Sequence, residues 1–156
     1  MLKSFSALTA AAVLGLAAVG ISATPGDAKN SHASTASRLR CEAVAGTETS
    51  LSARHESRVQ KKGPRTKFHV AFETTTTDGF AAGQSVAFSV DTVVVGTVAL
   101  ASVDGTLLET AVGFDSKARA GTKRAFPAGF PAVAAGSVVE VAVDGTMVLG
   151  CVLASS

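Results

Sequence analysis

The stretch Lys67–Glu73, which reads KFHVAFE, alternates large apolar side chains with polar or charged ones. Because successive side chains of a β-strand point to opposite faces of a sheet, this spacing places Phe68, Val70 and Phe72 together on one face. The charged side chains of the stretch then share the opposite face with His69. The stretch therefore predicts a strand that is buried on one face only.

Similar Val-rich or alternating stretches recur through the rest of the chain. They are short, are separated by Gly, Asp and Pro, and are rich in the β-branched residues that strands favour. About eight such strands, with no amphipathic helix after residue 37, predict an all-β fold, either an antiparallel β-sandwich or a small closed barrel. The further stretches are 38–43, 86–90, 94–100, 107–114, 139–143 and 147–153.

Three turn signals separate the predicted strands. Asp104-Gly105 and Asp144-Gly145 each lie between apolar runs, which is the pattern typical of a β-hairpin. Lys61–Pro64 is expected to close another hairpin as a four-residue loop, so that Gln60 pairs with Arg65. Each signal therefore predicts an antiparallel pair of strands.

One long stretch, 116–136, lacks a strand pattern. It contains Phe126-Pro127 and Phe130-Pro131, and residues before proline are held in an extended conformation. We therefore expect a structured crossover that lies over one end of the fold. Phe126 and Phe130 are expected to fill the core at that end.

Residues 1–23 have the layout of a secretory signal peptide, with Lys3 ahead of an uncharged apolar run and Ser22-Ala23 at the end. Cleavage is expected after Ala23, which leaves about 133 residues with no membrane span. The alternatives are cuts after Gly20 or Ala28, or an uncleaved anchor, although the run is richer in Ala and Gly than an anchor needs. Residues 24–37 are polar and predict a flexible linker, and the folded domain is expected over 38–156.

Cys41 and Cys151 are the two cysteines of the sequence. An even number of cysteines in an exported chain favours a disulfide. One cysteine lies near the start of the predicted domain and the other near its end, so the bond would enclose almost the whole domain. The alternative is two buried free thiols. A zinc or redox site is disfavoured because there is no Cys-x-x-Cys and no histidine near either cysteine in the sequence.

An internal repeat relates residues 81–102 to residues 134–155 at an offset of 53 positions, with ten identities in 22 positions. Most of the shared residues are Ala, Gly and Val, which are common in this chain, so composition accounts for part of the match. We expect a duplicated hairpin. Two copies are too few for a solenoid.

His55 and His69 are the histidines of the predicted domain. In the expected hairpin register they point to opposite faces, with His55 at the edge of the core and His69 on the surface opposite Glu56. A shared metal site is therefore not expected. The sequence has no Gly-x-Ser-x-Gly motif and no distinctive carboxylate pair, so no catalytic residue and no cofactor site is predicted. Three further candidate metal ligands are better explained by turn chemistry than by calcium: Asp91, Asp104 and Asp144.

Basic residues gather in two segments of the chain. Residues 54–67 carry a net charge of +5 and residues 117–124 carry +4, while the rest of the predicted mature chain carries −8. Two such loops could form a patch that binds a polyanion. The alternative is a pair of solvated edges, where lysine discourages pairing between sheets. The candidate residues are Arg54, Arg58, Lys61, Lys62, Arg65, Lys67, Lys117, Arg119, Lys123 and Arg124.

The chain contains no Trp and no Tyr. Single-stranded nucleic acids bind to exposed aromatic platforms, and most of the phenylalanines here lie at buried positions of the predicted strands. Carbohydrate-binding faces also typically rely on exposed aromatic rings. Nucleic acid and carbohydrate ligands are therefore disfavoured.

Three groups of turn and core residues form one pattern: Arg58 with Arg65, Phe68 and Val70; Ala82-Gly83 with Val86, Phe88, Val90, Asp91, Val95-Gly96 and Val98; and Phe130–Gly136 with Val139 and Val141. Across Arg38–Leu153 this pattern resembles a small module of uncharacterised secreted bacterial proteins. The resemblance implies a β-sandwich and transfers no activity, cofactor or site residue. Neither cysteine belongs to the shared pattern.

These observations predict an exported, non-enzymatic module that acts by binding or by structural association, in the periplasm, at the cell surface or outside the cell. The expected partner is an envelope polyanion or another secreted protein. Two alternatives are a polyanion-binding protein that uses 54–67 and 117–124, and a secreted enzyme of a type that the sequence does not identify.

Overall fold

The computed structural model describes residues 36–119 and 124–156. The expected signal peptide 1–23 and all but the last two residues of the expected linker 24–37 lie outside the described residues. The first strand, β1, begins at Ala36, two residues before the expected start of the domain. The structure therefore includes Ala36 and Ser37 in the folded domain.

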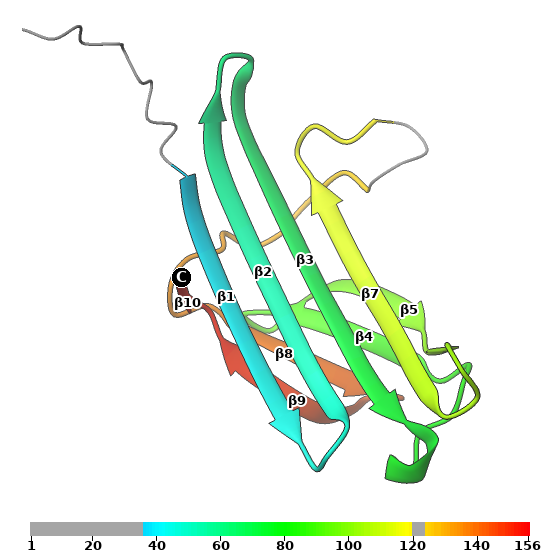
Figure 1. The fold of residues 1–156 in the computed structure, drawn as a ribbon. Coiled ribbons are helices and arrows are strands. Elements are labelled where there is room, and N and C mark those ends of the chain that lie inside the picture. The colour runs from blue at the N-terminus through cyan, green and yellow to red at the C-terminus, as the bar shows by residue number, and fades with distance from the viewer. Residues whose placement is uncertain (1–35, 120–123) are drawn as a thin grey trace, which may run out of the picture. The chain divides into compact units, whose positions relative to one another are not determined.

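The described residues form two antiparallel sheets that pack against each other, so the fold is a β-sandwich and not a closed barrel (Figure 1). The six-stranded sheet has the order β10-β1-β2-β3-β7-β6, and the four-stranded sheet has the order β5-β4-β8-β9. The strands are β1 (Ala36–Ala45), β2 (Thr49–Gln60), β3 (Gly63–Thr75), β4 (Ser85–Val90), β5 (Val93–Ala99), β6 (Ala101–Ser102), β7 (Leu107–Asp115), β8 (Val138–Val143), β9 (Thr146–Val152) and β10 (Ala154–Ser155).

Helical structure in the described residues is confined to one short 3₁₀ turn, Thr76–Asp78. No described helix has the length and apolar character that crossing a membrane requires. The all-β expectation is therefore confirmed.

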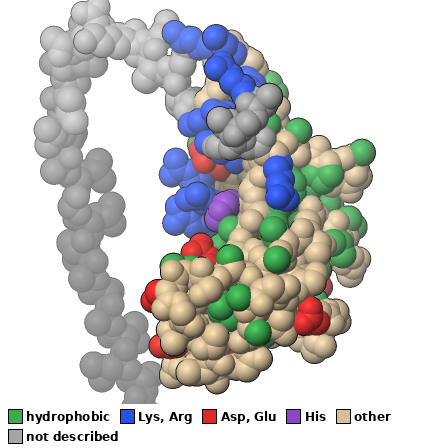
Figure 2. Space-filling model, turned by 90° about the vertical axis from the view of Figure 1, so that its right-hand side faces the viewer, with side chains coloured by type: hydrophobic (Ala, Val, Ile, Leu, Met, Phe, Trp, Pro, Cys, Tyr) green, Lys and Arg blue, Asp and Glu red, His purple; other side chains and the backbone are tan. Residues whose placement is uncertain are grey.

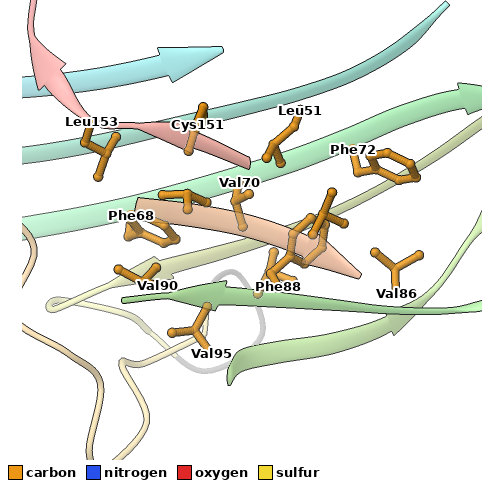
Figure 3. Packing of buried hydrophobic residues seen from close by; sticks show 14 of the residues in the cluster. Leu51, Phe68, Val70, Phe72, Val86, Phe88, Val90, Val95, Cys151 and Leu153 are labelled. Carbon is orange, nitrogen blue, oxygen red and sulfur yellow. The ribbon is translucent and has the colours of Figure 1, made fainter. Parts of the chain in front are cut away.

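The core lies between the two sheets, and its residues follow the predicted alternation. Phe68, Val70 and Phe72 of β3 are almost completely buried, and they face Phe88 of β4 and its neighbours across the sandwich (Figure 3). Because every second residue of each central strand enters this layer, the other side chains of the same strands are left on the outer faces.

The β2–β3 hairpin turns in two residues, Lys61 and Lys62, and not in four as expected. Gln60 therefore pairs with Gly63. Gly63 has a φ of 90°, a left-handed conformation that glycine adopts without strain and that lets the chain re-enter the strand early. The register differs from the expected one by two residues, so every side chain keeps its predicted face but has a different partner.

The internal repeat is a structural duplication. Adding 53 to the bounds of β4, β5 and β6 gives the bounds of β8, β9 and β10. The hydrogen bond from the Gly83 amide to the Leu100 carbonyl, 2.8 Å long, has its counterpart between Gly136 and Leu153 at the same distance. Each copy is therefore a hairpin followed by a short third strand.

The two copies pair with each other through β4 and β8. In this antiparallel pair Phe88 lies opposite Val141, and these residues occupy equivalent positions in the two copies. The pairing is therefore centred on a local two-fold axis. The hairpins of both copies form the four-stranded sheet, while the third strands β6 and β10 join the two opposite edges of the six-stranded sheet.

A turn aspartate of each copy caps the first central strand of the other. The Asp91 carboxylate accepts a hydrogen bond from the Val138 amide at 2.8 Å, and the Asp144 carboxylate accepts one from the Ser85 amide at 3.0 Å. Both aspartates have positive φ, 47° and 48°, as tight hairpin turns require. Turn chemistry therefore gives both residues a structural role without a metal.

Cys41 of β1 and Cys151 of β9 form the expected disulfide, with their Cα atoms 5.6 Å apart. The bond joins the two sheets and closes a sequence separation of 110 residues. This confirms the pairing predicted from the number and positions of the cysteines.

The crossover between β7 and β8 packs against one end of the core, as expected for its described part. Phe126 and Phe130 stack edge to face, with ring centroids 4.7 Å apart. Phe130 also contacts Phe68 and Phe114. The crossover is therefore fixed next to the part of β3 that contains Phe68.

We expect the disulfide to contribute a large share of the stability. Replacing both Cys41 and Cys151 with alanine removes a cross-link that restricts the unfolded chain. For a loop of 110 residues the chain-entropy model gives a loss of about 4–5 kcal/mol. Urea unfolding of the parent and the double variant, followed by circular dichroism, measures this loss. Two free thiols in the mass of the non-reduced protein would contradict the bond.

We expect Asp91→Ala and Asp144→Ala each to lower the free energy of unfolding by about 1–2 kcal/mol. Each change removes an acceptor from a strand amide and places alanine at positive φ. The matched Asp→Asn variants keep an acceptor oxygen and tolerate this backbone conformation, so their losses should be smaller. Equal losses for Asn and Ala in chemical denaturation would refute this role.

Candidate functional site

The outer face of the six-stranded sheet carries most of the cations of the described chain, arranged in rows across neighbouring strands. In one row Arg38 of β1 lies opposite Glu56 of β2, which lies opposite Lys67 of β3. In Figure 2 the outer face of the six-stranded sheet lies on the left, and the Lys and Arg side chains gather along its upper part. We call the following residues the basic face: Arg38, Arg40, Arg54, Arg58, Lys61, Lys62, Lys67 and His69.

The central row of the basic face contains no acidic residue. Arg40 of β1 lies opposite Arg54 of β2, which lies opposite His69 of β3. Arg40 and His69 are exposed, and no described carboxylate lies within ion-pair distance of Arg40 or Arg54. The row therefore presents a concentrated positive potential to solvent.

Acidic residues occupy the other end of the same sheet face. Glu73 of β3 lies opposite Glu109 of β7, and Glu42 of β1 lies one row away from Arg40. The red side chains below the blue and purple ones in Figure 2 follow this division. The face is therefore polarised along the strands, with its positive end toward the β2–β3 turn.

Arg65, one of the predicted polyanion contacts, is engaged within the fold. Its guanidinium donates two hydrogen bonds to the Asp115 carboxylate, at 3.0 and 2.6 Å. The Asp115 side chain is fully buried. The hydrogen bond to Asp115 raises the pKa of Arg65 above its usual value. Arg65 therefore neutralises a buried carboxylate, which gives it a structural role that the sequence did not indicate.

Lys117 also has a structural contact that the sequence did not indicate. Its ammonium group donates hydrogen bonds to the carbonyls of Lys62 and Gly63, at 2.7 and 3.2 Å. This contact holds the crossover against the β2–β3 turn. The two basic segments of the sequence are thereby brought together.

A hollow of about 470 Å³ lies between the turn and the crossover, lined by Lys61, Lys62, Lys117 and Arg119 among others. Arg124 belongs to the same region, where its carbonyl accepts a hydrogen bond from the Asp115 amide at 3.0 Å. Lys123 lies outside the described residues. The hollow therefore extends the positive surface beyond the strands.

Arg38 and Arg40 are members of the basic face that the sequence analysis missed. Charge summed along the sequence groups both arginines with the acidic remainder of the chain. Their alternation with Leu39 and Cys41 was the available signal, since it places both arginines on the outer side of β1. Pairing of β1 with β2 then brings them beside the predicted patch.

The two histidines lie on opposite faces, as predicted. His55 is buried opposite Phe68, and desolvation lowers its pKa. His69 is exposed and lies opposite Arg54, whereas the expected partner was Glu56, because the shorter turn shifts the register by two residues. Among the described residues no group of three or more His, Cys, Asp or Glu side chains could hold a metal ion.

Comparison with known proteins finds no matching family model, no matching curated protein and no matching solved structure.

We expect Asp115→Asn to destabilise the fold by roughly 2 kcal/mol, because it replaces the charge-assisted contact with Arg65 by a weaker one inside the protein. The matched variant Glu56→Gln removes an acidic group that lies 3.9 Å from Arg58 on the partly exposed surface, and it should cost less than 1 kcal/mol. Thermal unfolding of both variants measures the difference. Equal melting temperatures would show that the Arg65–Asp115 contact is not structural.

Proposed function

We propose that this protein is an exported, non-enzymatic β-sandwich module that binds an anionic polymer of the envelope or the extracellular space through its basic face. The observation that carries the proposal is the central row, in which Arg40, Arg54 and His69 lie side by side on three strands without an acidic neighbour in the row. The two arginines, held side by side in this way, attract a multivalent anion more strongly than scattered cations do.

The extent of the basic face favours a polymer over a small anion. Arg54 and the turn residue Lys61 are seven positions apart along β2, which corresponds to about 23 Å of strand. Arg38 and Arg40 widen the same surface onto β1. A ligand with repeated negative groups can contact several of these cations at once, and each contact adds to the affinity by release of counterions.

The chemistry of the face favours a non-nucleic polymer. The chain has no Trp or Tyr, and the rings of Phe68, Phe72 and Phe114 are buried in the core. Binding of single-stranded nucleic acid commonly uses exposed rings on which bases stack. A polymer recognised by its charge alone needs no such rings.

Three features support export. Residues 1–23 have the pattern of a secretory signal. The Cys41–Cys151 disulfide is typical of an oxidising compartment. The resemblance to modules of secreted bacterial proteins points in the same direction. We therefore place the ligand in the periplasm, at the cell surface or outside the cell.

The triple variant Arg38→Gln, Arg40→Gln, Arg54→Gln should elute from heparin at clearly lower salt than the parent. Its plot of log affinity against log salt concentration should be shallower by about two units, because three ionic contacts are lost. Isothermal titration with dextran sulfate at several salt concentrations measures the slope.

The control is a second triple variant with the same change of net charge on the other sheet, Val94→Glu, Thr97→Glu, Val152→Glu. All three residues are exposed on the outer side of the four-stranded sheet. This variant should keep most of the salt dependence of the parent. An equal loss of retention in both variants would show that net charge alone, and not the basic face, governs binding.

A further inference from the structure

The central row of the basic face lines a hollow of about 420 Å³, to which Arg40, Arg54 and His69 all contribute, with Glu42 of β1 at its acidic end. Neighbouring strands lie about 4.8 Å apart, so the three side chains are close enough to contact one anionic group. Gly113 of β7 lies opposite His69, and a Cβ atom at this glycine would come 3.4 Å from Cδ2 of the imidazole. The missing side chain therefore gives the imidazole space on the side away from the arginines.

The charges around His69 come from every strand that packs beside it. On β2 the facing residue is Arg54, with Glu56 two positions along the strand, and on β3 itself Lys67 is two positions away. Glu42 of β1 lines the same hollow as His69. On β7 the acidic groups are Glu109 and Asp115, of which Asp115 is held by Arg65. Desolvation by the neighbouring side chains lowers the pKa of His69, the charge of Arg54 lowers it further, and Glu109 opposes both effects. His69 is therefore mostly neutral at pH 7 in the free protein.

Resting on the proposed function, we propose that Arg40, Arg54 and His69 form one subsite for a sulfate ester or phosphodiester group, in which His69 becomes the third cation under mildly acidic conditions. Such groups remain ionised across this range of pH. The two arginines are always charged, so they provide binding at neutral pH. Protonation of His69 then strengthens it.

The direction of the pH effect follows from linkage. A bound anion favours the charged form of His69, so it raises the pKa of this histidine relative to the free protein. By the same linkage, affinity for the anion rises as the pH falls through the pKa of His69, which lies below 6.5 in the free protein. At pH well above this value the histidine contributes no charge.

The experiment measures the affinity for dextran sulfate at pH 7.5 and pH 5.0, at constant ionic strength. Dextran sulfate keeps its charge at both values, so the pH effect belongs to the protein. The parent should bind about 2- to 5-fold more tightly at pH 5.0, the effect expected of one additional exposed charge near the ligand. For His69→Gln the ratio of the affinities at the two pH values should fall close to one, because the variant has no group that gains a charge at this position.

Two further variants make the result specific. His69→Lys carries a permanent cation, so it should bind tightly at both pH values. His55→Gln changes a buried histidine on the opposite face and should keep the gain of the parent, with folding checked by circular dichroism. The NMR titration of the His69 Cε1 proton should move to higher pH when dextran sulfate is added.

Failure of this inference differs from failure of the proposed function. If the parent binds dextran sulfate equally at both pH values, or if His69→Gln keeps the full gain, the subsite is wrong while the basic face stands. If the parent does not bind at either pH, both proposals are wrong. A parallel titration with linear polyphosphate distinguishes a preference for sulfate from one for phosphate.

Discussion

The antiparallel pairing of β4 with β8 is the constraint on which the rest of the sandwich depends. At its centre the fully buried side chains of Phe88 and Val141 lie on opposite strands at equivalent positions of the two copies. At both ends of the pair a turn aspartate of one copy, Asp91 or Asp144, accepts a hydrogen bond from a strand amide of the other copy, which fixes the register. Because a two-fold relation sends the third strands in opposite directions, β6 and β10 reach opposite edges of the six-stranded sheet.

This arrangement leaves the outer face of the six-stranded sheet uncovered by the four-stranded sheet. The short strands β10 and β6 form the two edges of this sheet. The disulfide joins β1 to β9 of the four-stranded sheet. The β2–β3 hairpin extends past the four-stranded sheet (Figure 1). The contact of Lys117 with the carbonyls of Lys62 and Gly63 supports its tip. The cations therefore lie on strands that are fixed at both ends, so the spacing between the cations is rigid.

The sequence predicted the faces of side chains better than it predicted their partners. Faces depend on parity, and parity is unchanged by a shift of two residues, so His55 and His69 are on opposite sides despite the wrong register. The partners depend on turn length, which the left-handed conformation of Gly63 shortened. The repeat was visible because its turns and core need the same residue types twice. The place of Arg38 in the basic face could not be predicted from charge summed along the chain, because a sheet brings together charges from different strands.

Arg65 and Arg54 show why a count of basic residues does not define a site. Both lie on the β2–β3 hairpin, yet Arg65 neutralises the buried Asp115, while Arg54 lies opposite Arg40 on one side and His69 on the other. Like charges directly opposite each other in a sheet destabilise it. An anion bound as we propose would remove this repulsion and so would also stabilise the folded protein. The central row therefore carries an unfavourable contact between like charges that, under the proposed function, a bound anion would relieve.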